Sequence, residues 1–552
     1  MKRDFDAIDA VRFAGSAFER HLVDGFVDGR VSRREFLRHG SVLGLAMPTL
    51  LRVAGLGAGA YSALGTARAA PGGTIRVAQK APSGSVDPVT VANAGGLLLL
   101  QQVGEFLCID GPDLILRPAL ATSWKPNADS TVWTFAIRQN VKFHDGRSMT
   151  ADDVIASIER LADPKNSSNA LSAFKGYLTK GNAKKLDDHT VEFHLDAPNG
   201  SFPYLVSSDN YNAIILPADY SGNFEATFNG TGPFKLDKYI PKVSASFVRN
   251  PDYWGEKALP DRTEFTFYTD NPPMILALQG GQVDIIQQVP VLAGVGLLAD
   301  PNVSIISLKS SAHQQLHMRT DMEPFRDKRV RRAMALALDR SKLAKGLMRG
   351  RALEGNDSPF APVYPSTDTS VPQRHKDIAE AKALLQAAGA KDLKVTLTTE
   401  QYLEIPEYAQ LVQNAAREIG ITIDLNILDQ GAYYGDAVFG KSNWLDSPMG
   451  ITDYGHRGVP NVYLSAPLRS DGTWNSAHFK SADYDRLVSG FIATADLESQ
   501  KQQAGSIQRL LLDETPVIFS YFYDFLTVTS KTVRGVQPTA ISQLFLEKAT
   551  MG

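Results

Sequence analysis

Strand-like and helix-like patterns alternate along most of this chain of 552 residues. Residues 394–398 have a strand pattern, residues 405–419 carry apolar side chains at helical spacing, and residues 421–428 place an apolar side chain at every second position. This order is typical of a βαβ unit, in which a helix connects two parallel strands of one sheet. The chain is therefore expected to fold as an α/β protein.

The same alternation occurs elsewhere in the chain. Residues 131–138 and 190–195 are expected to be half-buried strands, because apolar and polar residues alternate in both. A helix is expected after Thr150, where a capping-box pattern precedes an apolar periodic segment. Two more helices are predicted over residues 327–348 and 378–388 from their spacing of three and four.

Charge and cysteine content exclude several classes of protein. The chain has 57 Lys and Arg against 60 Asp and Glu, so it offers no broad electrostatic attraction to nucleic acid. Its single cysteine, Cys108, forms neither an intramolecular disulfide nor a thiolate metal cluster. We expect no metal and no cofactor, and no nucleic-acid partner.

The first seventy residues contain an export motif. The segment Ser32-Arg33-Arg34-Glu35-Phe36-Leu37 precedes a weakly apolar, glycine-rich stretch and resembles a twin-arginine signal. Ala67 and Ala69 supply the small-x-small pattern of a cleavage site. Residues 1–69 are therefore predicted to be a cleaved twin-arginine signal peptide, which implies the twin-arginine translocase as a partner and a periplasmic location.

Two alternatives to a simple cleaved leader stay open. Residues 1–30 are longer than a signal requires, so they are either an extended leader or the product of a misassigned start. A retained membrane anchor is disfavoured, because Arg52, Gly55 and Gly57 interrupt the apolar stretch.

Several blocks of the chain resemble the peptide, nickel and oligopeptide family of solute-binding proteins that serve ABC importers. These blocks are PALATSW (118–124), WTF (133–135), VKFHDGR (141–147), TADDV (150–154), GTGPF (230–234), RNPDYWG (249–255), LQGGQVD (278–284), PFRD (324–327), RVRRA (329–333) and AKALL (381–385). Together they place the resemblance over nearly all of residues 72–540.

The resemblance implies a two-lobed periplasmic binding protein-like fold with a hinge and an extra subdomain. It implies a discontinuous first lobe, the subdomain and a second lobe, and the expected ranges are 70–105, 210–300 and 516–552 for lobe I, 106–209 for the extra subdomain, and 301–515 for lobe II. A ligand held in the interlobe cleft would select the closed form, which an inner-membrane ABC permease would recognise. The protein is expected to act as a monomer.

The strongest candidate for a ligand contact is Asp453. It lies in Gly450-Ile451-Thr452-Asp453-Tyr454, which resembles the segment in which peptide-binding relatives place an Asp against the α-amine of the ligand. A carboxylate that meets an ammonium in a closed cleft orients the ligand and disfavours ligands without the amine. The alternative is an Asp that caps a turn, and residues 455–460 depart from the family pattern.

Further cleft candidates are aromatic or polar residues. An aromatic wall that packs ligand side chains is expected from Trp444, Tyr433, Tyr434 and Tyr454, with core packing as the alternative. Asn93 lies in a turn with small residues, where a ligand could approach the backbone, or it simply begins a helix. Arg319 and Phe360 are weaker cleft candidates. A metal site at His313 and His317 is disfavoured because the surrounding residues favour extended chain.

The favoured hypothesis is a periplasmic receptor that captures a peptide or peptide-like solute and delivers it to an ABC permease. The first alternative is the same fold with a non-peptide solute, such as an opine-like conjugate, an oligosaccharide or a nickel chelate. The second alternative is an exported hydrolase. The sequence contains no nucleophile elbow, phosphate loop, zinc-protease motif or dinucleotide fingerprint, so we expect no enzymatic activity.

Overall fold

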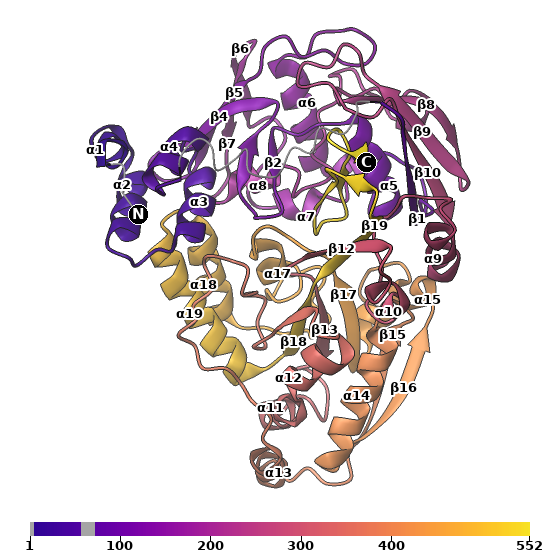
Figure 1. Ribbon diagram of the computed structural model, residues 1–552. Helices are drawn as coiled ribbons and strands as arrows, with labels where there is room; N and C mark the ends of the chain where they lie inside the picture. The colour runs from indigo at the N-terminus through magenta and orange to yellow at the C-terminus, as the bar shows by residue number, and fades with distance from the viewer. Residues whose placement is uncertain (1–4, 57–71) are drawn as a thin grey trace.

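The computed structural model describes residues 5–56 and 72–552. The molecule has two lobes, one above the other in Figure 1, and each is built around its own β-sheet. Helices cover the sheets, as the alternating sequence pattern predicts. The α/β class and the two-lobed architecture are confirmed.

The first lobe contains a seven-stranded sheet. Its strand order is β12 (Val303–Leu308), β19 (Phe525–Ser530), β11 (Ile285–Ile286), β1 (Thr74–Lys80), β10 (Arg262–Tyr268), β9 (Ser244–Arg249) and β8 (Phe234–Ile240). Strand β1 is parallel to both of its neighbours, and the other pairs are antiparallel. Helices α5 (Ala94–Val103) and α9 (Asn271–Gln279) pack against β1.

A four-stranded antiparallel sheet extends the first lobe. Its order is β4 (Ala121–Pro126), β5 (Val132–Ile137), β7 (Thr190–His194) and β6 (Ala183–Asp187). Both strands expected here are present, and α6 (Ala151–Ala162) begins after Thr150 with the reciprocal capping box to Asp153. Trp133, Phe135 and Phe193 share a continuous core with the seven-stranded sheet.

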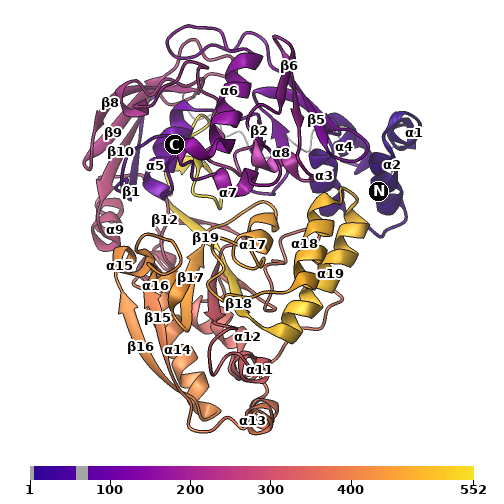
Figure 2. The ribbon, with the colours of Figure 1, turned by 180° about the vertical axis from the view of Figure 1, so that it is seen from behind.

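The second lobe contains a six-stranded sheet. Its order is β14 (Ala352–Glu354), β18 (Val517–Tyr523), β13 (His313–Met318), β17 (Met449–Tyr454), β15 (Lys394–Glu400) and β16 (Thr422–Leu428). Strands β15 and β16 are parallel and are connected by α14 (Ile405–Glu418), which confirms the expected βαβ unit. The turned view in Figure 2 shows α14 lying along this edge of the lobe.

The helix predicted over residues 327–348 is broken into three parts. They are α11 (Lys328–Ala337), α12 (Arg340–Lys342) and a π-helical turn over Leu343–Leu347. The break has a local cause, because the Asp339 side chain accepts a hydrogen bond from the Lys342 backbone N–H and so starts a new helix. The helix predicted over residues 378–388 is α13 (Ile378–Ala387).

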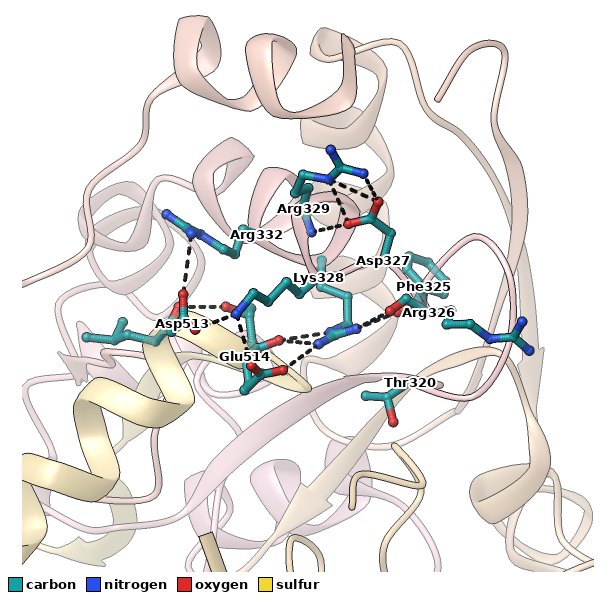
Figure 3. A network of polar contacts seen from close by, with 12 residues as sticks. Thr320, Phe325, Arg326, Asp327, Lys328, Arg329, Arg332, Asp513 and Glu514 are labelled. Atoms are coloured by element: carbon teal, nitrogen blue, oxygen red, sulfur yellow. Dashed lines mark hydrogen bonds and ion pairs between the residues drawn. The ribbon is translucent and has the colours of Figure 1, made fainter. Parts of the chain in front are cut away.

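Helices α18 (Ala482–Ala493) and α19 (Leu497–Glu514) form the outer side of the second lobe. A charged network ties the end of α19 to the start of α11 (Figure 3). Lys328 contacts both Asp513 at 2.6 Å and Glu514 at 3.1 Å, and the buried Arg331 donates to the Glu514 carbonyl at 2.6 and 2.9 Å. This network fixes the strand β18, which follows α19, against the helical layer.

The chain crosses between the lobes twice at neighbouring positions. Residues 309–312 connect β12 of the first sheet to β13 of the second, and Asp524 connects β18 of the second sheet to β19 of the first. Strand β12 therefore pairs in the first sheet although it lies in the range 301–515, and β18 pairs in the second although it lies in 516–552. The ranges expected from the resemblance follow the order of the chain, whereas the sheet in which a strand lies depends on long-range pairing.

Among residues 5–56, the structure has four helices: α1 (Phe5–Ala14), α2 (Ala17–Val27), α3 (Arg33–Val42) and α4 (Met47–Val53). They share a small apolar core that also includes Ala495 and Leu497 of the second lobe. In the parts of the chain that the structure describes, no helix is long and apolar enough to cross a membrane. Ala67 and Ala69, the expected cleavage-site residues, lie outside the described residues.

The other elements are short and connect these layers. They are β2 (Cys108–Asp110), β3 (Leu116–Pro118), α7 (Leu171–Phe174), α8 (Phe202–Leu205), α10 (Val295–Leu298), α15 (Gln430–Tyr434), α16 (Asn443–Asp446), α17 (Asn461–Ser465), β20 (Val533–Arg534), β21 (Gln537–Pro538), β22 (Leu544–Phe545) and β23 (Thr550–Met551), with 3-10 turns at Pro164–Asn166 and Phe224–Ala226.

Candidate functional site

A partly open cavity of about 80 Å³ lies between the two lobes. The first lobe contributes residues from positions 169–173 and 204–212, and the second lobe contributes residues from positions 457–474. The aromatic rings of Tyr204, Tyr211 and Trp474 line it together with polar side chains. Aromatic rings beside a few polar and charged side chains are typical of small-molecule sites.

Opposite charges face the cavity from opposite lobes. Asp209 of the first lobe accepts a hydrogen bond at 2.6 Å from the Gly458 backbone N–H of the second lobe. Burial raises the pKa of Asp209 to about 6, while Arg457 and this N–H act in the opposite direction. The Arg457 guanidinium lies over the ring of Tyr211, 5.3 Å from its centre. The cavity thus offers an anionic and a cationic group to one ligand.

The loop between β17 and α17 carries the second-lobe side of the cavity. Ser311, in the crossing between the lobes, holds this loop: its backbone N–H donates to His456 Nδ1 at 3.0 Å and its hydroxyl to the Arg457 carbonyl at 2.9 Å. At the start of α17, both polar atoms of the Asn461 amide are buried without a hydrogen-bond partner among the described residues. The Asn461 amide is therefore available to donate a hydrogen bond to a ligand in the cavity and to accept one from it.

Asp453 lies near the end of β17, in a pair with Glu400 of β15. The Tyr523 hydroxyl donates to Asp453 Oδ1 at 2.9 Å, and the Tyr434 hydroxyl donates to Glu400 Oε1 at 2.8 Å. Burial raises the pKa of both carboxyls, and the charge of Glu400 raises the pKa of Asp453 further. Two partly desolvated carboxyls side by side would be stabilised by a cation placed against them.

The predicted aromatic residues lie together beside Asp453. One cluster is formed by Tyr433, Tyr434, Trp444, Tyr454, Tyr463 and Trp474. Tyr433 is fully buried and donates to the Ile451 carbonyl at 2.9 Å, so it supports β17. Trp474 belongs to this cluster and also lines the interlobe cavity, and it therefore connects the predicted aromatic wall with that cavity.

The remaining predicted contacts lie apart from this cluster. The Asn93 side chain accepts a hydrogen bond from the Gly96 N–H and caps α5. Arg319 pairs with Asp321 at 2.7 Å and donates to the Asp446 carbonyl. Phe360 is buried in a second-lobe core, where its ring meets Phe491 edge to face. Their contact with a ligand stays a prediction.

The two histidines that were set aside as metal ligands are both in β13, in extended chain as expected. Burial lowers the pKa of each to about 4, so both are neutral near pH 7. His317 contacts the Ser447 carbonyl, and His313 stacks on Tyr454.

Sequence reasoning missed the residues that line the cavity. Among the described residues, its lining includes none of the predicted contacts, but it includes Asp209, Tyr211, Arg457, Asn461 and Trp474. One signal was present, because the loop that departs from the family pattern, residues 455–460, carries the second-lobe wall.

A family model for the middle part of bacterial extracellular solute-binding proteins, family 5, matches residues 116–475, which is more than half of the chain. The protein belongs to this family. The family 5 chain is 26% identical over 489 residues to the dipeptide-binding protein DppE of Bacillus subtilis, covering 82% of this chain and 87% of that protein. It is also 26% identical to a probable peptide ABC transporter periplasmic-binding protein of Sinorhizobium fredii, over 94% of this chain and 100% of that protein.

Solved structures share the fold of this family 5 protein. The periplasmic binding protein DppA of Helicobacter pylori, in complex with the peptide STSA, superposes with a TM-score of 0.74 at 22% identity, over 87% of this chain and 98% of that chain. NikZ of Campylobacter jejuni, in complex with Ni(L-His), superposes with a TM-score of 0.73 at 22% identity, over 84% of this chain and 96% of that chain.

Proposed function

We propose that this family 5 protein captures a peptide or peptide-like solute between its lobes and delivers it to an ABC permease in the membrane. The observation that carries the proposal is the interlobe cavity, whose walls come from both lobes and present Asp209 and Arg457 on opposite sides. A peptide carries a carboxylate, which suits Arg457, and backbone N–H groups, which suit Asp209. The peptide-binding relatives support the same class of ligand.

Capture requires that the ligand favour the closed form. A solute that contacts only one lobe leaves the equilibrium between open and closed forms unchanged, whereas a solute that contacts both lobes shifts it by its differential affinity. Asp209 and Arg457 lie on different lobes, so a ligand bound to both stabilises closure. The permease then recognises the surface of the closed form.

We also propose that Asp453 receives the α-amine, beside the aromatic cluster whose member Trp474 lines the cavity. The raised pKa of Asp453 shows that its buried carboxylate lacks a neutralising charge, which a ligand ammonium would supply. In Asp453→Asn the charge is lost but the shape is kept, and we expect the affinity for trialanine to fall about tenfold to a hundredfold, as for a hydrogen bond to a charged group.

The test is isothermal titration of wild type and Asp453→Asn with trialanine and N-acetyl-trialanine. Wild type should prefer the free amine, and the variant should bind both peptides equally weakly. Equal binding of both peptides by wild type would contradict the role of Asp453. Native mass spectrometry of the purified protein identifies the natural solute, and release of a non-peptide compound would contradict the peptide assignment.

We also propose that the protein is exported through the twin-arginine translocase. Arg33 and Arg34 lie in a motif that fits the twin-arginine translocase, and the relatives include a probable periplasmic D,D-dipeptide-binding protein. We place the mature protein in the periplasm, as a monomer, after cleavage near residue 69. Edman sequencing of the periplasmic protein tests the cleavage, and a mature protein that begins before Arg33 would overturn it.

A further inference from the structure

Arg38, just after the twin-arginine motif, inserts its guanidinium between the two lobes. The residue is 2% exposed. Its Nε donates to the Leu114 carbonyl of the first lobe at 3.1 Å, and its Nη2 donates to the Gly458 carbonyl of the second lobe at 3.2 Å. Its Nη1 donates to the Val363 carbonyl, also of the second lobe. Three backbone carbonyls from both lobes therefore surround one guanidinium.

Two carboxyls lie beside this site. Ligand atoms of Asp110, Asp209 and His456 lie within 4.8 Å of one another, and all three residues are buried. In the described part of the chain, Asp110 Oδ1 has no hydrogen-bond partner. Burial raises the pKa of Asp110 and of Asp209, and the charge of Arg38 lowers both. Burial holds the pKa of His456 at about 3, so this imidazole is neutral near pH 7.

The buried carboxyls of Asp110 and Asp209 require positive charge nearby. Two buried carboxyls are unfavourable without a nearby cation. Arg457 supplies one positive charge on the side of Asp209. The second comes from Arg38, whose planar, five-donor group suits a ring of carbonyls better than a compact ammonium does.

The Arg38 guanidinium fills a space between the carbonyls of Leu114, Val363 and Gly458, which we call the chamber. The chamber adjoins the interlobe cavity. Arg38, Gly458, Tyr204 and Val459 line one small pocket here, and Tyr204 and Val459 also line the interlobe cavity. The Tyr204 hydroxyl donates to the same Leu114 carbonyl that accepts from Arg38. Arg38 thus makes contacts with both lobes, as a captured ligand has to do.

Arg38 is delivered by a segment with its own small core. Phe36 stacks on Phe26 inside the N-terminal helices, while Glu35 pairs with Lys501 and His39 contacts the Ala495 carbonyl of the second lobe. These contacts lie on the outer side of the molecule, where Figure 1 shows α3 beside α18 and α19. The segment is attached to the body like a tethered ligand, with the Arg38 guanidinium between the lobes.

We infer that the chamber is a guanidinium-binding site adjacent to the solute cavity, and that Arg38 occupies it as a tethered stand-in for a guanidinium group of the solute. The inference rests on the proposed function, since it names an arginine-bearing peptide as the solute class. Removal of the N-terminal segment would empty the chamber, and closure around a solute would then require a new guanidinium between the same carbonyls.

The experiment empties the chamber in the full-length chain and refills it from solution. Arg38→Ala is expected to lower Tm, and millimolar agmatine should restore at least about half of the loss. Butylamine has an ammonium and butylurea a neutral group of similar shape, and neither should restore it. Wild type, in which the site is filled, and Arg20→Ala, an exposed change on the same segment, should not respond to agmatine.

Two further variants keep the test decisive. Arg38→Lys retains the positive charge and so protects the fold, and its response to agmatine should lie between those of wild type and Arg38→Ala. Adding Asp110→Asn to Arg38→Ala should abolish the rescue. No selective response to agmatine in either Arg38 variant would overturn the guanidinium site.

Titration with peptides separates this inference from the proposed function. Arg38→Ala should bind Ala-Arg-Ala more tightly than Ala-citrulline-Ala. Equal binding of the two peptides would overturn the guanidinium site and leave peptide capture intact. If neither peptide nor trialanine binds, peptide capture fails, even where agmatine still raises Tm.

Discussion

Gly458 packs directly against the opposite lobe, and adding one methyl group there should disfavour closure. A Cβ at this position would lie 2.6 Å from Tyr204 Cε1 and 2.9 Å from Asp110 Oδ2, both on the opposite lobe. Neither neighbour yields easily, because the Tyr204 hydroxyl is bound to the Leu114 carbonyl at 3.0 Å and both side chains are buried. Gly458→Ala is therefore an overpacking change that acts on the closed form alone.

The expected magnitude follows from the contact distances. Overpacking of a well-filled interior costs about 1–3 kcal/mol, which lowers the closed-to-open ratio about fivefold to 150-fold. Small-angle scattering should then give a larger radius of gyration for Gly458→Ala than for wild type. Trialanine should also bind more weakly by a similar factor.

The matched control lies three residues earlier in the same loop. A Cβ at Gly455 would meet no atom within 4 Å. Gly455→Ala shares the effect of a Gly→Ala change on the unfolded chain but inserts nothing between the lobes. It should scatter and bind like wild type. An unchanged radius of gyration in Gly458→Ala would refute the reasoning that closure depends on this contact.

Two further predictions concern stability. Burial raises the pKa of Glu105 from its ordinary 4.5 to about 7, although Tyr253, Trp254 and Thr231 donate hydrogen bonds that act in the opposite direction. The folded protein therefore keeps the Glu105 proton up to about pH 7. Stability should therefore fall by on the order of 3 kcal/mol as the pH rises from 4.5 to 7, and urea unfolding of Glu105→Gln should show a flatter pH profile; an equal slope in both proteins would contradict it. Asp357 is fully buried between Arg340, at 2.6 Å, and Arg374, at 2.7 Å. Asp357→Asn should cost about 3–5 kcal/mol because it leaves buried cations unpaired, whereas Asp424→Asn, in an exposed pair with Lys394, should cost less than about 1 kcal/mol; similar losses in the two variants would contradict the assignment.

Local signals predicted the local structure well. The capping box at Thr150 and the alternation around β5 and β7 act over a few residues, and the structure has the helix and both strands. The break at Leu338 was missed because helical spacing continued through it. Asp339, a strong N-cap type in the middle of that pattern, was the signal that pointed to a new helix.

The interlobe cavity could not be predicted in the same way. Its walls join residues near Asp209 with residues near Arg457, which are far apart in sequence, and only the packing of two lobes brings them together. The aromatic cluster around Trp444 was predictable as a group because its members are close in sequence. Whether it contacts the solute stays a prediction.

The N-terminal helices show a similar division. Ser32 and Glu35 form a capping box that is visible in the sequence, and the structure has it at the start of α3. The burial of Arg38 has no such signal, because its three carbonyl partners come from loops at positions 114, 363 and 458.

The double crossing between the lobes restricts how the molecule can move. Ser307, at the end of β12, and Lys309, on the first crossing, both bind Asp524 on the second crossing, at 2.7 and 3.0 Å, so the two connections behave as one. A single flexible linker would let the lobes twist as well as swing, whereas two coupled pivots leave one rotational degree of freedom. Each opening then follows the same arc, and each return brings Asp209 back to the Gly458 N–H without a search over orientations.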